Sequence, residues 1–305
     1  MKESDKSTNG ISAQGNSGLE LSVGSIRTLF RIQDKAFLCL LNERYRAFNS
    51  TGPYKYDLII DVKPLSYFVE RDLVSKDTSV PRMKAYTSNG NLIIARTKVP
   101  FKAIIDTVTG RGIVRILKND ESFDNFLRVF YSLVLAGESG ILLHAHTITN
   151  DGQGMVFLGG SDIDESTMAR ISSSGQVLTD GLVLIRNYKG EFYVFGTPFG
   201  NGSVNHRSNS YVPLKGLYLL KRDTETYLYV LPQLTAVQEL YSYLFLFEHP
   251  PSLLESISQT CSILANNVPI CELHLQQDGS LEEIVPSLID DNHWKVCGFP
   301  ELSKN

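Results

Sequence analysis

The feature that most constrains the fold of this chain is a glycine-rich turn between a short apolar strand and a segment that begins with Ser-Thr. Residues 157–167 read FLGGSDIDEST. This order matches the outline of a phosphate-binding loop, in which glycines let several backbone N–H groups point into one concavity. The residues that fit the outline are two glycines and a closing pair of hydroxyl residues: Gly159, Gly160, Ser166 and Thr167.

The segments on either side of this loop follow a recognisable order. An apolar strand containing His144 precedes the loop, and a strand containing Asp180 follows it. Residues 196–199 then read GTPF, and a further apolar strand begins at Pro213. In order and spacing, residues 140–285 resemble the HPr kinase/phosphorylase family and the kinase-like proteins that share the P-loop fold of ATP-dependent phosphoenolpyruvate carboxykinase.

The resemblance implies a role for each matching residue. Gly159 would be the first glycine of a loop that binds ATP, with Gly160 and Ser161 beside it. Ser166 would bind Mg²⁺, and Thr167 would supply a second hydroxyl. Two further residues are candidates for catalysis: Asp180, the first of two acidic residues that assist proton transfer and hold the metal in this family, and His144. Gly181 stands in place of the second acidic residue.

The loop departs from the family pattern in its charges. Asp162 and Asp164 stand where the family has glycines, and Glu165 stands where it has the phosphate-binding lysine. A carboxylate about 5 Å from a phosphate charge repels it by roughly 3 kcal/mol at an effective dielectric constant near 20. Loss of the lysine removes a comparable attraction. The usual mode of ATP binding is therefore disfavoured.

A kinase-like fold combined with an acidic loop leaves two possible functions. In the first, the chain is a catalytically impaired relative that acts by binding, as a partner or regulator of another protein. In the second, it is a working ATP- and Mg²⁺-dependent phosphotransferase that acts on a protein or another substrate. Asp180 is then the base, Ser166 holds the metal, and Arg170 or Lys215 replaces the missing lysine.

Several of these residues also have simpler interpretations. The three loop carboxylates suit a divalent cation, but acidic residues are also favoured near a helix N-terminus. His144 and His146 alternate and so share one face of a strand, in a catalytic, metal-binding or packing role. Asp180 is a remnant of the family site or a cap of a turn before Gly181.

The remaining pattern predicts an α/β protein with two domains. Helical spacing predicts a helix over residues 34–48 with Asp34 as its N-cap, and a second helix over 123–135 capped by Ser122 or Asp120. Residues 56–62 and 268–275 are predicted strands, and the turns at 88–91 and 110–112 predict two hairpins.

Residues 21–138 are therefore expected to form a small α+β domain dominated by antiparallel hairpins. Residues 139–290 are expected to form the mixed-sheet P-loop domain. Residues 1–20 are polar and predict a disordered tail, and residues 291–305 a C-terminal tail.

Composition limits the partners. The formal net charge is −4 and Lys and Arg are scattered, which argues against nucleic acid as a partner. Apolar runs are too short to span a membrane. Four cysteines without close pairing predict reduced, mostly buried thiols in a cytoplasmic protein. The resemblance leaves a homo-oligomer open.

Overall fold

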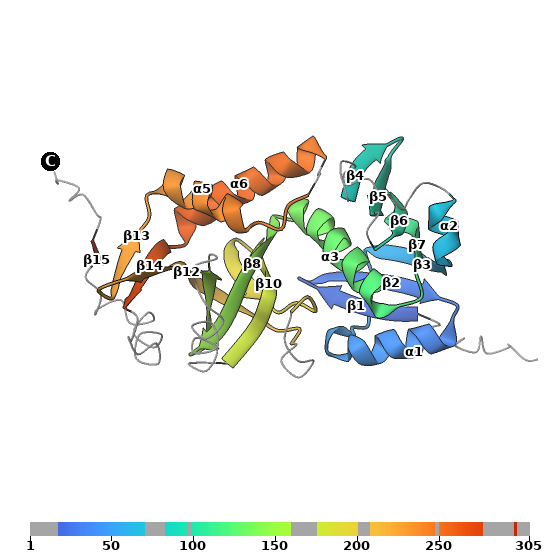
Figure 1. Ribbon diagram of the computed structural model, residues 1–305, viewed down its shortest axis with the longest axis horizontal. Coiled ribbons are helices and arrows are strands. Elements are labelled where there is room, and N and C mark those ends of the chain that lie inside the picture. The colour runs from blue at the N-terminus through green and yellow to red at the C-terminus, as the bar shows by residue number, and fades with distance from the viewer. Residues whose placement is uncertain are drawn as a thin grey trace, which may run out of the picture.

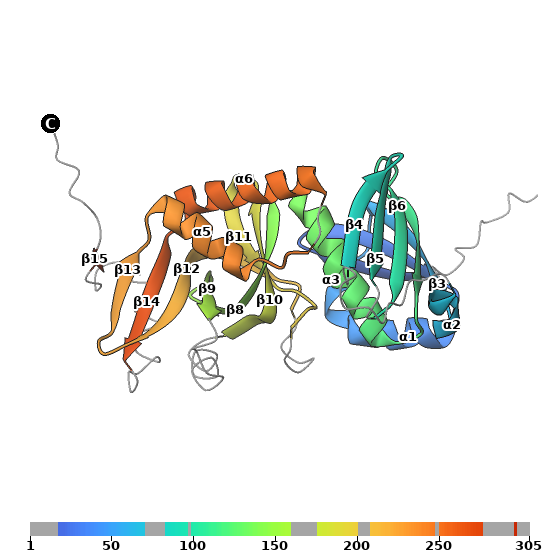
Figure 2. The same cartoon turned by 45° about the horizontal axis from the view of Figure 1, so that its top comes forward.

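The computed structural model describes residues 18–70, 83–96, 99–159, 176–200, 208–247, 250–276 and 296–297. Two β-sheets lie side by side along the long axis of the molecule, and helix α3 (Asp120–Ala136) lies between them (Figures 1 and 2). In both sheets parallel and antiparallel strands occur together. The expected α/β class is thus present, and both sheets are mixed.

The N-terminal sheet has the strand order β1-β2-β3-β7-β6-β5-β4 in the described part of the chain. Its strands are β1 (Gly18–Val23), β2 (Ile26–Ile32), β3 (Tyr56–Val62), β4 (Met83–Ser88), β5 (Asn91–Arg96), β6 (Phe101–Asp106) and β7 (Arg111–Ile116). Its smaller helices are α1 (Lys35–Arg44), η1 (Arg46–Phe48) and α2 (Leu65–Val69).

Local sequence signals explain much of this sheet. Asp34 caps α1, because its side chain accepts a hydrogen bond from the N–H of Phe37. The β4–β5 hairpin turns at Asn89 and Gly90, which both have positive φ, as a type I′ turn requires. The predicted strand over β3 and the second hairpin, β6–β7, are confirmed.

Antiparallel pairs do dominate the sheet, as expected, although β3 pairs in parallel with both β2 and β7. Other expectations for this half are wrong. The tail expected over residues 1–20 ends earlier, because β1 begins at Gly18 and Leu19 is fully buried. The N-cap of α3 is Asn119, whose side chain accepts from the N–H of Ser122, and not Asp120 or Ser122 itself.

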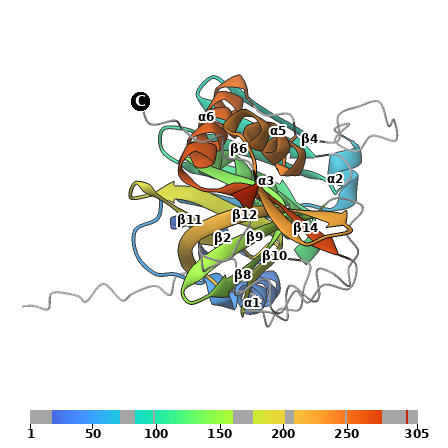
Figure 3. The ribbon, with the colours of Figure 1, turned by 90° about the vertical axis from the view of Figure 1, so that its left-hand side faces the viewer.

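The C-terminal sheet has the strand order β11-β10-β8-β9-β12-β14-β13-β15. Its strands are β8 (Gly140–Asn150), β9 (Gln153–Gly159), β10 (Gln176–Tyr188), β11 (Glu191–Phe195), β12 (Tyr211–Asp223), β13 (Tyr227–Val230), β14 (Ile270–Gln276) and β15 (Val296–Cys297). Helices α5 (Gln233–Tyr243) and α6 (Pro251–Asn267) lie together over one face of this sheet (Figure 3).

Two expectations are corrected here. Residues 179–181 do not form a turn between two strands. They lie inside the long strand β10, where a register shift between Val177 and Thr179 marks a bulge. The C-terminal tail expected over 291–305 includes β15, which pairs in parallel with β13.

The largest hydrophobic core joins the two sheets. It contains the aromatic face of α3, and it continues into the second sheet through Leu142, Leu184 and Phe199. Tyr131 of α3 is fully buried and links both sides, since its hydroxyl donates to Thr28 Oγ1 at 3.2 Å and its ring lies 6.3 Å from that of Phe199. Residues 21–138 and 139–290 therefore share a core.

The cysteines match the expected thiols only in part. Cys261 and Cys271 are buried and unpaired, and burial raises the pKa of each thiol to about 12. Cys39 is exposed. Among the described residues, no helix is long and apolar enough to cross a membrane.

Candidate functional site

The first glycine of the predicted loop lies at a position where α/β proteins commonly bind ligands. Gly159 is the last residue of β9, which runs parallel to β12, and β12 runs parallel to β14. The carboxyl ends of parallel strands meet at one edge of a sheet, and ligands bind outside that edge. The rest of the predicted loop lies outside the described residues: Gly160, Ser161, Asp162, Asp164, Glu165, Ser166, Thr167 and Arg170.

The candidate residues of the flanking strands converge on the same face. Asp180 lies opposite His146 in the β10–β8 pair, and His146 lies opposite Phe157 in the β8–β9 pair. Gly159 is two residues beyond Phe157, and His144 is two residues before His146, so both share this face. Helices α5 and α6 pack on the opposite face, through residues such as Val156.

Asp180 and His146 form the closest contact of this group. Asp180 Oδ1 lies 2.9 Å from His146 Nδ1, at ion-pair distance but without the angle of a regular hydrogen bond. The two side chains are 36% and 29% exposed, so solvent or a ligand can reach the pair. The contact with His146 lowers the pKa of Asp180 below 3.8, although burial opposes it. An ionised carboxylate with a low pKa suits metal binding better than general-base catalysis near pH 7.

The predicted GTPF turn at residues 196–199 packs against β10 on both sides of Asp180. Thr197 is buried; its N–H donates to Thr179 Oγ1 at 3.0 Å, and its hydroxyl donates to the carbonyl of Leu182 at 2.6 Å. A Cβ atom on Gly200 would lie 2.6 Å from the carbonyl oxygen of Asp180. These contacts hold the turn against β10 and restrict the backbone of Asp180.

The backbone at Gly181 is unfavourable for the second acidic residue of the family pattern. Gly181 has φ +118°, which side-chain-bearing residues rarely adopt. We expect Gly181→Asp to lower the free energy of unfolding by about 1–3 kcal/mol, because the strand must hold a strained residue. Gly152→Asp is the matched control, since Gly152 has φ +74° in an open turn and Asp tolerates that region. Urea denaturation measures both. Equal costs would contradict the strain at Gly181.

His144 occupies a different environment from His146. Its ring packs edge-on against Phe245 at a centroid distance of 5.8 Å. Partial burial lowers its pKa below 6.5, and the nearby charge of Arg128 lowers it further. Both effects favour the neutral form of the imidazole.

Lys215 does not lie near the start of the loop. In the β9–β12 pair, Leu220 lies opposite Gly159, and Lys215 precedes Leu220 by five residues. At about 3.3 Å per residue this places Lys215 roughly 16 Å from that end of the strand. Lys215 is therefore wrong as a replacement for the missing lysine. Lys221 and Arg222, which follow Leu220, lie at the loop end.

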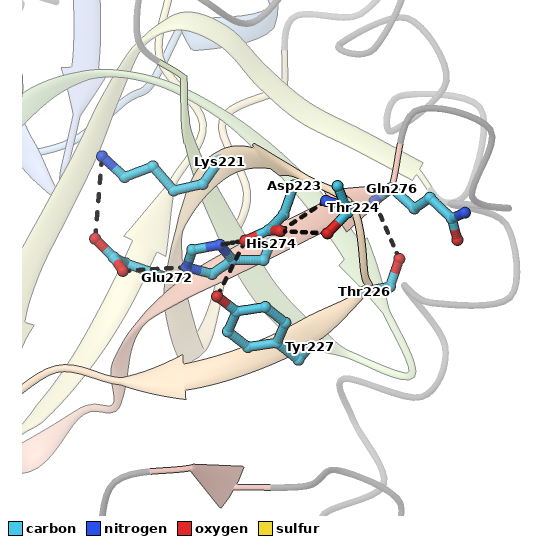
Figure 4. A network of polar contacts seen from close by, with 8 residues as sticks. All are labelled: Lys221, Asp223, Thr224, Thr226, Tyr227, Glu272, His274 and Gln276. Carbon is cyan, nitrogen blue, oxygen red and sulfur yellow. Dashed lines mark hydrogen bonds and ion pairs between the residues drawn. The ribbon is translucent and has the colours of Figure 1, made fainter.

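A polar network that the sequence did not reveal lies beside Lys221 (Figure 4). His274 Nδ1 lies 2.8 Å from Asp223 Oδ2, and its Nε2 lies 3.2 Å from Glu272 Oε2. The ring of Tyr227 stacks on His274 at 4.2 Å. Backbone donation from Thr224, then His274 and Tyr227, lowers the pKa of Asp223 to about 2. Glu272 and His274 alternate in one predicted strand, which was the available signal.

This network ties the β12–β13 connection to β14. Both nitrogens of His274 already face carboxylates, and Glu272 also lies 4.0 Å from Lys221 Nζ. Within the described ranges, no cluster of His, Cys, Asp or Glu side chains has the arrangement of a metal site. The network therefore has a structural role, which is to hold β12, β13 and β14 together.

A separate groove of about 530 Å³ lies on the outer face of the N-terminal sheet. Its lining includes Ile59, Ile104 and Ile113, with Arg31 and Arg115 among the charged residues beside them. It contains none of the site residues predicted from the sequence.

Comparison with solved structures gives a distant likeness. No protein-family model matches the sequence, and no curated protein matches it. The HPr(Ser) kinase/phosphatase from Coxiella burnetii is similar in structure over 49% of this chain and 88% of its own length, with 11% identity and a TM-score of 0.30. A likeness at this TM-score indicates at most a distant structural relationship.

Proposed function

We propose that this chain is an HPr kinase-like P-loop protein that does not bind ATP in the usual way and acts by binding another protein. The observation that carries the proposal is the charge of the loop that follows Gly159. Asp162, Asp164 and Glu165 place three carboxylates where a phosphate cradle has glycines and a lysine. Such a loop repels the ligand that the fold usually holds.

The described part of the site adds support. Gly181 occupies the place of the second acidic residue with a backbone unsuited to a side chain. Lys215 lies too far along β12 to supply the missing positive charge. Asp180 is engaged by His146, and its low pKa makes it a weak proton acceptor near pH 7.

The alternative function is an active ATP-dependent phosphotransferase with an atypical loop. One observation favours it: Asp180 keeps an ionised, partly exposed carboxylate on the face that Gly159 shares. In this alternative, Asp180 and Ser166 would hold Mg²⁺, with the metal offsetting the loop carboxylates.

A nucleotide titration separates the two functions. We expect no rise in melting temperature with millimolar ATP in the presence of Mg²⁺ or Mn²⁺. A ligand at 100 times its dissociation constant stabilises the folded state by about 2.7 kcal/mol, so binding would be visible. Stabilisation that requires the metal and disappears in both Ser166→Ala and Asp180→Asn would overturn the proposal and support the kinase.

A further inference from the structure

Three basic side chains meet where the N-terminal sheet, α3 and β8 come together. Arg96 is the last residue of β5, Arg128 lies in the middle of α3, and His144 lies in β8. Arg96 Nη1 donates a hydrogen bond to Asn125 Oδ1. Asn125 and Arg128 are three residues apart and therefore lie on the same side of α3. This contact holds Arg96 against the side of α3 that carries Arg128.

The directions of two pKa shifts agree with this placement. The pKa of Arg96 is lowered first by burial and then by the charge of Arg128. The pKa of His144 is lowered by the same two causes in the same order. The charge of Arg128 thus acts on both groups. His144 is exposed on one side, so the cluster is open to solvent.

The positive charge of this cluster is not neutralised within the described part of the chain. The Nε of Arg128 is buried there without a hydrogen-bond partner, and no ion pair of Arg128 is present. Arg96 is bonded to a neutral amide. The charge of Glu121 raises the pKa of Arg96, but this effect is smaller than the lowering caused by burial and by Arg128. Partly buried charges without partners are costly, and folded proteins normally pair them.

We propose that Arg96, Arg128 and His144 form a binding site for an oxyanion, of the phosphate or carboxylate class. Guanidinium groups present several donors in a plane and bind such anions through paired, charge-assisted hydrogen bonds. Two guanidinium groups supply the charge that a phosphate dianion needs, and His144 adds a third polar group. The ring of Phe245 packs against His144 and limits its movement.

This site is independent of the proposed function. It uses none of the residues of the loop at 159–167, and it needs neither ATP nor a metal. Its position at the junction of the two sheets means that an occupying anion would contact β5, α3 and β8 together. Binding would therefore stabilise the packing of the two halves.

Thermal denaturation of the full chain tests the proposal. In a buffer without oxyanions, inorganic phosphate should raise the melting temperature in a saturable way, and sodium chloride at equal ionic strength should not. Acetate serves as the carboxylate arm and distinguishes the two anion classes. In Arg128→Gln we expect the phosphate dissociation constant to rise at least tenfold.

Controls make the result specific. Arg46→Gln removes an exposed arginine outside the cluster and should leave the phosphate response unchanged. Arg128→Gln without phosphate should be at least as stable as the wild type, because it removes an unpaired, partly buried charge. If Arg128→Gln does not fold, Arg96→Gln and His144→Gln give the same comparison.

Two results would overturn the oxyanion site. One is a phosphate response no larger than that of sodium chloride. The other is an equal phosphate response in the wild type and in the cluster variants. ATP also carries phosphates, so any ATP response lost in Arg128→Gln but kept in Ser166→Ala belongs to this cluster and leaves the proposed function intact.

Discussion

Tyr131→Ala should lower the free energy of unfolding by about 3–5 kcal/mol, as expected for deletion of a large buried aromatic ring. The side chain is fully buried, lies 5.1 Å from the ring of Phe130 and 6.3 Å from that of Phe199, and donates to Thr28 Oγ1. Because it joins the cores of both sheets, its loss should weaken both halves. Urea denaturation followed by hydrogen exchange measures the effect on each half.

Tyr131→Phe is the matched control. It keeps the ring and removes only the hydroxyl, so we expect a loss of about 0.5–1.5 kcal/mol. If Tyr131→Ala reduces the protection of α3 and β2 but leaves β8 and β10 unchanged, the two sheets are energetically separate and the shared core has been overstated.

The second large effect concerns the charges of the loop. The triple variant Asp162→Gly, Asp164→Gly and Glu165→Lys should gain ATP affinity. A charge at about 5 Å contributes roughly 3 kcal/mol at an effective dielectric constant near 20, so exchange of Glu165 for lysine changes the interaction by up to about 6 kcal/mol. That corresponds to roughly 10⁴-fold in the dissociation constant. Isothermal titration calorimetry with Mg²⁺ and ATP measures it.

Glu165→Gln separates the two parts of this effect. It removes the repulsion but adds no attraction, so the expected gain is only about half of the free energy. If the triple variant folds and still shows no ATP binding, the charges do not explain the loss of binding. The missing second acidic residue at Gly181 would then be the stronger explanation.

The sequence predicted those features that depend on neighbouring residues. Asp34 as a cap and the Asn89–Gly90 turn each follow from one or two side chains and their backbone preferences. The parallel pairing of β3 with β2 and β7 joins residues distant in the chain, and no local pattern records it. Thr179–Gly181 resembled a turn because Asp and Gly favour turns, whereas a bulged strand holds them here.

In the candidate site too, the sequence predicted what depends on neighbouring residues and missed contacts between distant ones. Alternation in one strand was enough to place His144 and His146 on one face, and the structure adds Asp180 opposite His146. The basic cluster could not be foreseen, because Arg96 and Arg128 come from different elements and meet only through packing. The one available signal was a lone arginine within the apolar stretch of α3.

Equilibrium dialysis of the wild-type chain against labelled ATP with Mg²⁺ tests most directly whether the loop after Gly159 binds nucleotide. We expect no saturable, metal-dependent binding up to millimolar ATP, because Asp162, Asp164 and Glu165 repel the phosphates. Saturable binding that requires Mg²⁺, persists in Arg128→Gln and disappears in Ser166→Ala would contradict this expectation and identify a working nucleotide site.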